Sequence, residues 1–225
     1  MSVAENLKNI KSIIPPHITL VAISKTHPPE VIMEAYNAGH RIFGENKVQE
    51  MISKQEVMPK DIQWHLVGHL QTNKVKYVAP FVSLIHSVDS AKLLKEINKC
   101  GAKNDRVIDC LLQVHIAEED TKFGLSAQEL DTMLSTPALA EYANVRVVGL
   151  MGMATFTDNM EQVRREFKGL ADTFKNVKQK YFANQPSFNT LSMGMSGDFE
   201  VAIEEGSTMI RVGSRIFGAR NYGAN

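Results

Sequence analysis

The sequence feature that most constrains the fold is a regular alternation of short apolar runs and helical stretches. Eight apolar runs follow one another along the chain, and seven of them precede a segment with helical periodicity. Strand runs that are apolar almost throughout are typical of parallel sheets buried on both faces. Eight such units predict an α/β fold, a single (β/α)8 TIM-type barrel, with a doubly wound open sheet as the alternative.

The same pattern gives the expected elements. The expected strands are 18–25, 41–46, 62–70, 82–89, 106–116, 145–153, 189–194 and 208–213. The expected helices are 4–14, 28–39, 48–58, 73–78, 90–101, 126–134, 158–181 and 198–206. Only a short turn fits after the last strand, and no linker or low-complexity segment interrupts the chain. We therefore expect residues 1–225 to form one barrel domain, with helix 4–14 preceding the first strand.

Composition argues against several classes of protein. Lys plus Arg and Asp plus Glu each number 25, so the formal net charge is zero. Nucleic-acid binders and polybasic membrane-surface proteins both depend on a concentrated positive field. Cys100 and Cys110 form no disulfide framework or zinc spacing, and no apolar run has the length of a signal peptide or membrane span. We expect a cytoplasmic protein without nucleic-acid or membrane partners, and a monomer, because no oligomerisation motif is visible.

Lys25 is the first candidate functional residue. In TIM-type barrels the active site lies at the carboxyl ends of the strands, and Lys25 ends the first apolar run. By strand periodicity Lys25 shares a face with Val21 and Ile23. If that face is the barrel interior, desolvation favours the neutral amine, which attacks an aldehyde to form a Schiff base. A lysine that extends into solvent is the alternative, and aldolase-like chemistry on a sugar phosphate also stays open.

Two glycine–serine loops predict a phosphate site. Segments 192–197 and 212–214 follow the seventh and eighth expected strands, where such barrels commonly bind phosphate. Glycines let backbone N–H groups approach an anion, and serine hydroxyls add donors. Two ordinary turns are the alternative interpretation.

Other motifs give weaker indications. His65 and His69 would share one face of a strand, but the absence of a nearby third ligand argues against zinc. The dinucleotide fingerprint GxGxxG, the hydrolase motif GxSxG and the P-loop are all missing. The sequence thus gives no indication of a nucleotide or a metal site.

Several longer motifs resemble one known family, the pyridoxal phosphate homeostasis proteins. These are single-domain relatives of the barrel half of alanine racemase. The similarity runs from about residue 20 to residue 218 in the right order. The motifs are ISKTHPP (23–29), FGENKVQE (43–50), WHLVGHL (64–70), SMGMSGDFE (192–200) and GSTMIRVGSRIFG (206–218). The resemblance implies a fold-type III barrel that binds pyridoxal 5′-phosphate (PLP).

The resemblance also assigns the cofactor residues. It implies that Lys25 holds PLP as a Schiff base, that Arg211 faces the pyridine nitrogen and that Asn46 lines the ring. It places the phosphate against Ser192, Met193, Gly213 and Ser214. No residue is assigned a catalytic role.

The implied function is PLP (vitamin B6) homeostasis with little or no catalysis. A permanently charged guanidinium beside the ring nitrogen disfavours its protonation and weakens the ring as an electron sink. Too few residues follow the eighth strand for the β-domain that supplies the second acid/base residue of alanine racemase. PLP-dependent apoenzymes or B6-metabolising enzymes are the expected partners. A PLP-dependent amino-acid racemase or transaminase of narrow scope is the alternative.

One motif departs from the family pattern. Many members carry a proline pair shortly after GLM, where this chain has GLMGMATF (149–156). We expect the departure to alter loop contacts after the sixth strand without touching any proposed cofactor residue.

Overall fold

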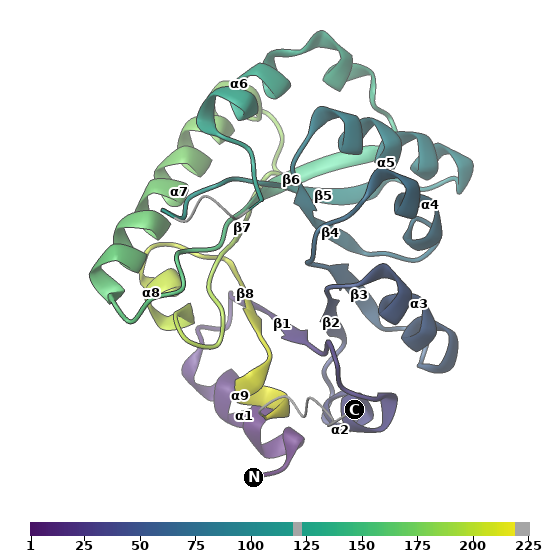
Figure 1. The fold of residues 1–225 in the computed structure, drawn as a ribbon, viewed down its shortest axis with the longest axis vertical. Helices are drawn as coiled ribbons and strands as arrows, with labels where there is room; N and C mark the ends of the chain where they lie inside the picture. Colours follow the sequence, from purple (N-terminus) through teal and green to yellow (C-terminus); the bar gives the residue numbers. More distant parts are fainter. Residues whose placement is uncertain (119–122, 219–225) are drawn as a thin grey trace.

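The computed structural model describes residues 1–118 and 123–218, and they confirm the barrel (Figure 1). Eight parallel strands close in sequence order, because β1 pairs with β8 as well as with β2. This pairing excludes the open sheet. The strands are β1 (Thr19–Ile23), β2 (Ile42–Glu45), β3 (Gln63–Leu66), β4 (Leu84–Val88), β5 (Ile108–Gln113), β6 (Val145–Met151), β7 (Thr190–Ser192) and β8 (Met209–Val212).

The helices lie around the outside of the strand ring (Figure 1). They include α1 (Val3–Ile13), α2 (Pro29–Asn37), α3 (Val48–Val57), α4 (Val75–Val78), α5 (Ala91–Lys103), α6 (Ala127–Ser135), α7 (Met160–Tyr181), α8 (Phe199–Glu204) and α9 (Ser214–Phe217). Short 3-10 turns cover Thr72–Lys74 and Pro137–Glu141. Ser126 and Glu129 form a capping box at the start of α6, the helix expected at 126–134.

Apolar residues form two layers of core. The larger layer packs the outward-facing strand residues against the helices, and it includes Phe43, Trp64 and Phe167. A smaller cluster fills the barrel interior: Val21, Ile23, Leu84, Leu111, Val148, Met151 and Met209. The interior is therefore packed, and only its ends offer space for a ligand.

The strands are shorter than predicted, mainly at their carboxyl ends. β1 ends at Ile23 and β3 ends at Leu66, so Lys25 and His69 lie in the loops that follow. The loops at this end of the barrel thus begin earlier than the apolar runs indicate.

Gly149 allows β6 and β7 to approach closely. It pairs in register with Thr190, and a Cβ atom at this position would overlap the Thr190 carbonyl oxygen. Only glycine fits here without moving a strand.

The two ends of the described chain meet beside the β1–β8 seam. α1 packs against α9, and the Asn6 side-chain amide donates to the Ile216 carbonyl at 3.0 Å. The predicted single domain also includes residues 119–122 and 219–225, which lie outside the described residues. Within the described ranges, no helix is both long and apolar enough to cross a lipid bilayer.

Candidate functional site

Lys25 lies in a tight turn at the carboxyl end of β1. The Ser24 N–H donates to the Gly44 carbonyl at 3.0 Å, which extends the strand pairing by one residue before the chain turns. Val21 and Ile23 face the barrel interior, as predicted, and Lys25 is partly buried. Thr26, the next residue, has a φ of 68°, which is rare for a β-branched residue.

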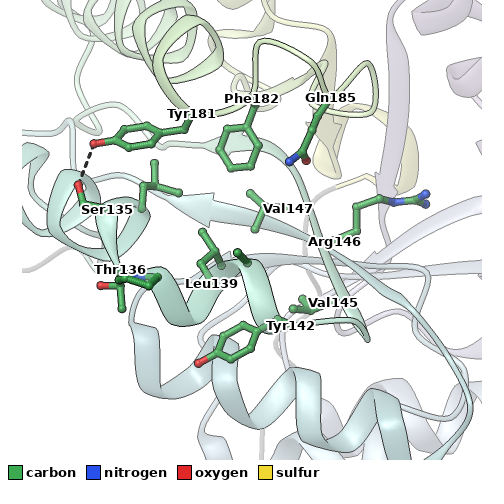
Figure 2. Close-up of a pocket in the computed structure, with 13 residues that line it drawn as sticks. Ser135, Thr136, Leu139, Tyr142, Val145, Arg146, Val147, Tyr181, Phe182 and Gln185 are labelled. Carbon is green, nitrogen blue, oxygen red and sulfur yellow. Dashed lines mark hydrogen bonds between the residues drawn. The ribbon is translucent and has the colours of Figure 1, made fainter.

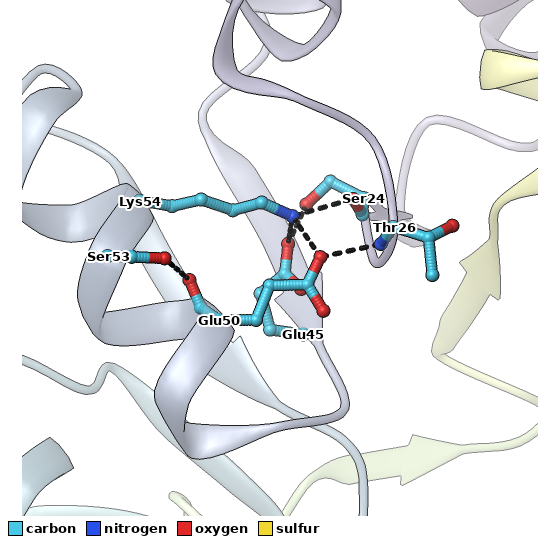
Figure 3. A network of polar contacts seen from close by, with 6 residues as sticks. All are labelled: Ser24, Thr26, Glu45, Glu50, Ser53 and Lys54. Carbon is cyan, nitrogen blue, oxygen red and sulfur yellow. Dashed lines mark hydrogen bonds and ion pairs between the residues drawn. The ribbon is translucent and has the colours of Figure 1, made fainter. Parts of the chain in front are cut away.

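A buried ionic network surrounds this turn (Figure 3). Lys54, from α3, donates to the Ser24 carbonyl at 2.9 Å and to the carboxylates of Glu45 and Glu50, each at 2.7 Å. The Ser24 hydroxyl donates to Glu45 Oε1 at 2.6 Å, and the Thr26 N–H donates to Glu50 Oε1 at 2.6 Å. Burial raises the pKa of Glu45, against the opposing effect of the Lys54 ammonium. Both residues that flank Lys25 are therefore fixed by side chains from β2 and α3.

Arg211 is a buried cation on β8, the strand beside β1. It pairs in register with Val21, so its side chain enters the barrel interior. Nη1 donates to the Ser192 hydroxyl at 2.6 Å and Nη2 to the Gly152 carbonyl at 3.0 Å. Burial lowers the pKa of the guanidinium to about 10, so it stays charged at neutral pH. Among the described residues these two acceptors are uncharged, and the Asp198 carboxylate acts on the guanidinium only through its charge, so the cation can also interact with an electron-rich ligand atom.

A chain of polar side chains continues from Arg211 across the barrel. The Ser192 hydroxyl lies 3.1 Å from His86 Nδ1, and His86 Nε2 lies 3.0 Å from His65 Nδ1. All four residues are buried. Burial lowers the pKa of His65 to about 3 and that of His86 well below its usual value. A neutral imidazole has one donor and one acceptor nitrogen, which is what an unbranched hydrogen-bonded chain requires.

Stability is expected to fall as pH drops from 7.5 towards 5, because buried histidines stay neutral in the fold. Burial lowers the pKa of His40 to about 4, and His65 and His86 are shifted in the same direction. The unfolded chain, whose histidines titrate near 6.5, then binds more protons than the folded chain. The stabilisation is complete above about pH 6.5 and is lost below it, with a slope approaching about 1.4 kcal/mol per pH unit per histidine.

Urea unfolding across this range measures the slope. In His40→Gln the slope of the free energy of unfolding against pH should be smaller by the contribution of one histidine. The raised pKa of Glu45 acts in the opposite direction and reduces the overall pH dependence of the free energy of unfolding. A free energy of unfolding that is constant between pH 7 and pH 5 would contradict the prediction.

The two glycine–serine loops lie side by side. The Ser196 hydroxyl, in the loop after β7, accepts the Gly213 N–H at 3.2 Å, and the Arg211 N–H donates to the Gly194 carbonyl at 2.9 Å. Gly194 has a φ of 96° and has no room for a Cβ atom against Phe199. Ser214 is exposed and begins α9, whose first N–H groups have no acceptor within the helix. The predicted phosphate loops are thus brought together by the fold.

Ser192 and Met193 lie at the base of these loops with their polar groups already engaged. The Ser192 hydroxyl contacts Arg211 and His86, and the Met193 N–H donates to the Met209 carbonyl at 3.2 Å. The Met193 side chain is buried in the outer core. A phosphate contact for these two residues stays a prediction.

Asn46 follows β2 and is partly buried. Its backbone packs so closely on Gly68 that a Cβ atom there would collide with it. Asn46 borders a pocket that also includes His69 and Tyr77.

The expectation that His65 and His69 share a strand face is wrong, because β3 ends at Leu66. His65 points into the barrel, whereas His69 pairs with Asp89 at 3.1 Å and stacks on Phe123. The described residues contain no cluster of three or more metal-ligating side chains.

The unusual loop after β6 contains none of the proposed cofactor residues, but its backbone contacts one of them. Its Gly152 carbonyl accepts from Arg211. Farther along, the Thr155 N–H and hydroxyl donate to the Glu166 carboxylate of α7 at 2.6 and 2.7 Å. The loop is therefore held by α7 at one end and supports Arg211 at the other.

A separate pocket lies outside the barrel, between α6, β6 and α7 (Figure 2). Leu134, Leu139, Val147 and Phe182 give it an apolar wall, and Ser135 and Tyr181 join by a 3.0 Å hydrogen bond at its edge. It contains none of the predicted cofactor residues.

Sequence reasoning missed the groups that support the site. His65 and His86 interrupt apolar strands, and Glu45 is the last residue of β2. Polar residues within or at the end of such runs are the local signal that could have indicated them. Lys54 gave no such signal, because its spacing from Glu50 is that of an ordinary exposed helical pair.

Comparisons with known proteins agree with this architecture. The family model of the alanine racemase N-terminal domain matches residues 1–221. The Pyridoxal phosphate homeostasis protein of Aquifex aeolicus is 45% identical over 204 residues, which cover 90% of this chain and 87% of that protein. Its Escherichia coli K12 counterpart is 38% identical over 212 residues, covering 92% and 88%.

Solved structures give the same result. PipY of Synechococcus elongatus, solved with PLP bound, superposes with a TM-score of 0.88 at 36% identity, covering 96% of this chain and all of that one. Alanine racemase of Bartonella henselae shares the fold at 17% identity, with a TM-score of 0.72 over 99% of this chain and 60% of its own. The chain belongs to the alanine racemase N-terminal domain family, as one of its pyridoxal phosphate homeostasis proteins.

Proposed function

We propose that this protein binds PLP and acts in PLP (vitamin B6) homeostasis, holding the cofactor on Lys25 with little or no catalysis. The observation that carries the proposal is the close similarity, over the whole length of the relative, to PipY solved with PLP bound. Covalent attachment joins the Lys25 nitrogen to the aldehyde carbon and releases one water molecule. PLP-dependent apoenzymes or B6-metabolising enzymes would receive the cofactor.

The residues around Lys25 fit this cofactor. Within the described residues, Arg211 is a buried positive charge whose hydrogen-bond acceptors are the Ser192 hydroxyl and the Gly152 carbonyl, and it suits an unprotonated pyridine nitrogen that accepts a hydrogen bond. Asn46 would line the ring, and Gly213 and Ser214 would hold the phosphate beside Ser196. PLP supplies its aldehyde and its electron-accepting ring when bound. Because a charged guanidinium discourages protonation of the ring nitrogen, the site favours holding the cofactor over stabilising a carbanion.

Loss of the loop hydroxyls should reduce the preference for PLP over pyridoxal, which lacks the phosphate. Each hydrogen bond to a charged group contributes about 1.5–3 kcal/mol, so Ser196→Ala with Ser214→Ala should weaken PLP binding by at least about tenfold. Pyridoxal affinity should not change, which makes pyridoxal the internal control. Titrations followed by absorbance measure both ligands. An unchanged preference in the double variant would mean that the phosphate lies elsewhere.

Exchange of the Cα hydrogen separates a carrier from a racemase or transaminase. Catalysis of exchange requires a base within hydrogen-bond reach of the Cα proton. We expect the PLP-loaded protein to exchange the Cα hydrogens of amino acids in D2O at a rate close to that of free PLP. Nuclear magnetic resonance follows the exchange, with alanine racemase as a positive control. Turnover at enzymatic rates would refute the carrier role.

A further inference from the structure

We propose that Lys54 is a positioning residue, which together with Glu45 and Glu50 fixes the turn that presents the Lys25 amine to PLP. The inference rests on the proposed function, in which Lys25 binds the cofactor. It concerns the ionic network of Figure 3, which contains none of the predicted PLP contacts.

The geometry of the Lys54 ammonium indicates a structural task. Its three acceptors are the Ser24 carbonyl and the carboxylates of Glu45 and Glu50, at 2.7–2.9 Å. Donation to three acceptors requires all three N–H groups of the protonated ammonium. A protonated nitrogen has no lone pair for attack on an aldehyde. Lys54 is therefore no alternative nucleophile to Lys25, although its amine lies beside Ser24, the residue before Lys25.

The network holds the backbone on both sides of Lys25. On one side, the Ser24 carbonyl accepts from Lys54, and the Ser24 hydroxyl donates to Glu45. On the other side, the Thr26 N–H donates to Glu50 at 2.6 Å. The position of the Lys25 Cα atom is thus set by three charged side chains.

The turn needs such support because its backbone is strained. Thr26 has a φ of 68°, and a non-glycine residue in the left-handed region costs about 1–3 kcal/mol. The hydrogen bond from Thr26 to Glu50 holds this conformation, and Lys54 holds Glu50. A buried ion pair adds little net stability compared with apolar side chains, so stabilising the fold is not a sufficient reason for burying Lys54 and Glu45 here. Orientation of the turn accounts for the arrangement.

The first test compares Lys54→Met with wild type. We expect covalent PLP capture, followed by absorbance in stopped flow, to be about 10- to 100-fold slower in the variant, because a displacement near 1 Å has effects of this size. Affinity for 4′-deoxypyridoxine 5′-phosphate, which has no aldehyde, should match wild type. Lys168→Met, which removes an exposed lysine paired with Asp172, is the control and should capture PLP normally.

A second comparison applies if Lys54→Met does not fold. Glu50→Ala removes only the partly exposed carboxylate that holds Thr26. Its capture rate is measured in the wild-type background and with Thr26→Gly, since glycine adopts a positive φ without strain. We expect Glu50→Ala to slow capture at least about tenfold with Thr26 and clearly less with Gly at this position.

The outcomes separate the two proposals. Folded Lys54→Met that captures PLP at the wild-type rate would overturn the positioning role while leaving the proposed function intact. An equal effect of Glu50→Ala in both backgrounds would also overturn it. Wild-type protein that forms no adduct on Lys25 would instead show that the proposed function itself is wrong.

Discussion

Lys25→Ala is expected to abolish covalent retention of PLP. Wild-type protein incubated with PLP should become yellow, lose this colour on borohydride reduction and carry a phosphopyridoxyl group on the peptide that contains Lys25. The variant lacks the amine and should carry no such group there. Its stability should change little, because the side chain lies beyond the end of β1 and outside the packed core.

Peptide mapping by mass after reduction measures this effect. PLP also reacts with exposed lysines, so Lys168→Ala provides a matched control that should keep the full adduct on Lys25. The loop hydroxyls and Arg211 are unchanged in Lys25→Ala, and the variant should therefore still bind PLP reversibly. Stoichiometric labelling of another lysine in wild-type protein would place the covalent site elsewhere.

Gly149→Ala is expected to prevent stable folding. A Cβ atom at this position would overlap the Thr190 carbonyl oxygen, which belongs to the neighbouring strand and cannot rotate away. Separating β6 from β7 would break the barrel ring, so we expect a loss of at least about 3 kcal/mol in the free energy of unfolding.

Urea denaturation followed by circular dichroism measures the loss. Gly169→Ala is the matched control, because a Cβ atom at this position in α7 meets nothing within 4 Å. This control should gain up to about 1 kcal/mol from helix propensity. Wild-type stability in Gly149→Ala would mean that β6 and β7 lie farther apart than in this structure.

The order of the elements could be predicted from the sequence because it depends on local signals. Apolar runs, helical periodicity and the capping pair Ser126–Glu129 each lie within one segment, and the structure reproduces them with small shifts. Strand ends were less predictable. The run 62–70 stays apolar beyond Leu66, but pairing with β2 and β4 stops earlier, and His69 leaves the strand.

Contacts across the barrel could not be predicted, because they depend on the stagger of the closed sheet. His65, His86, Ser192 and Arg211 come from four strands and meet only when that stagger is set. The contact between the Gly152 carbonyl and Arg211 also depends on the stagger of the closed sheet. The cofactor role of Arg211 came from family resemblance alone, whereas strand periodicity predicted only that Lys25 shares a face with Val21 and Ile23.

Closure of the ring also determines when the site can exist. Lys25 follows the first strand, whereas Arg211 belongs to the last, and these strands are neighbours through the pairing of Val21 with Arg211. A nascent polypeptide on the ribosome therefore carries Lys25 long before Arg211 has been synthesised. Assembly of the seam joins residues almost 200 positions apart, a non-local contact of the kind that forms slowly. Under the proposed function, PLP would therefore be bound only after β8 has been synthesised and paired with β1.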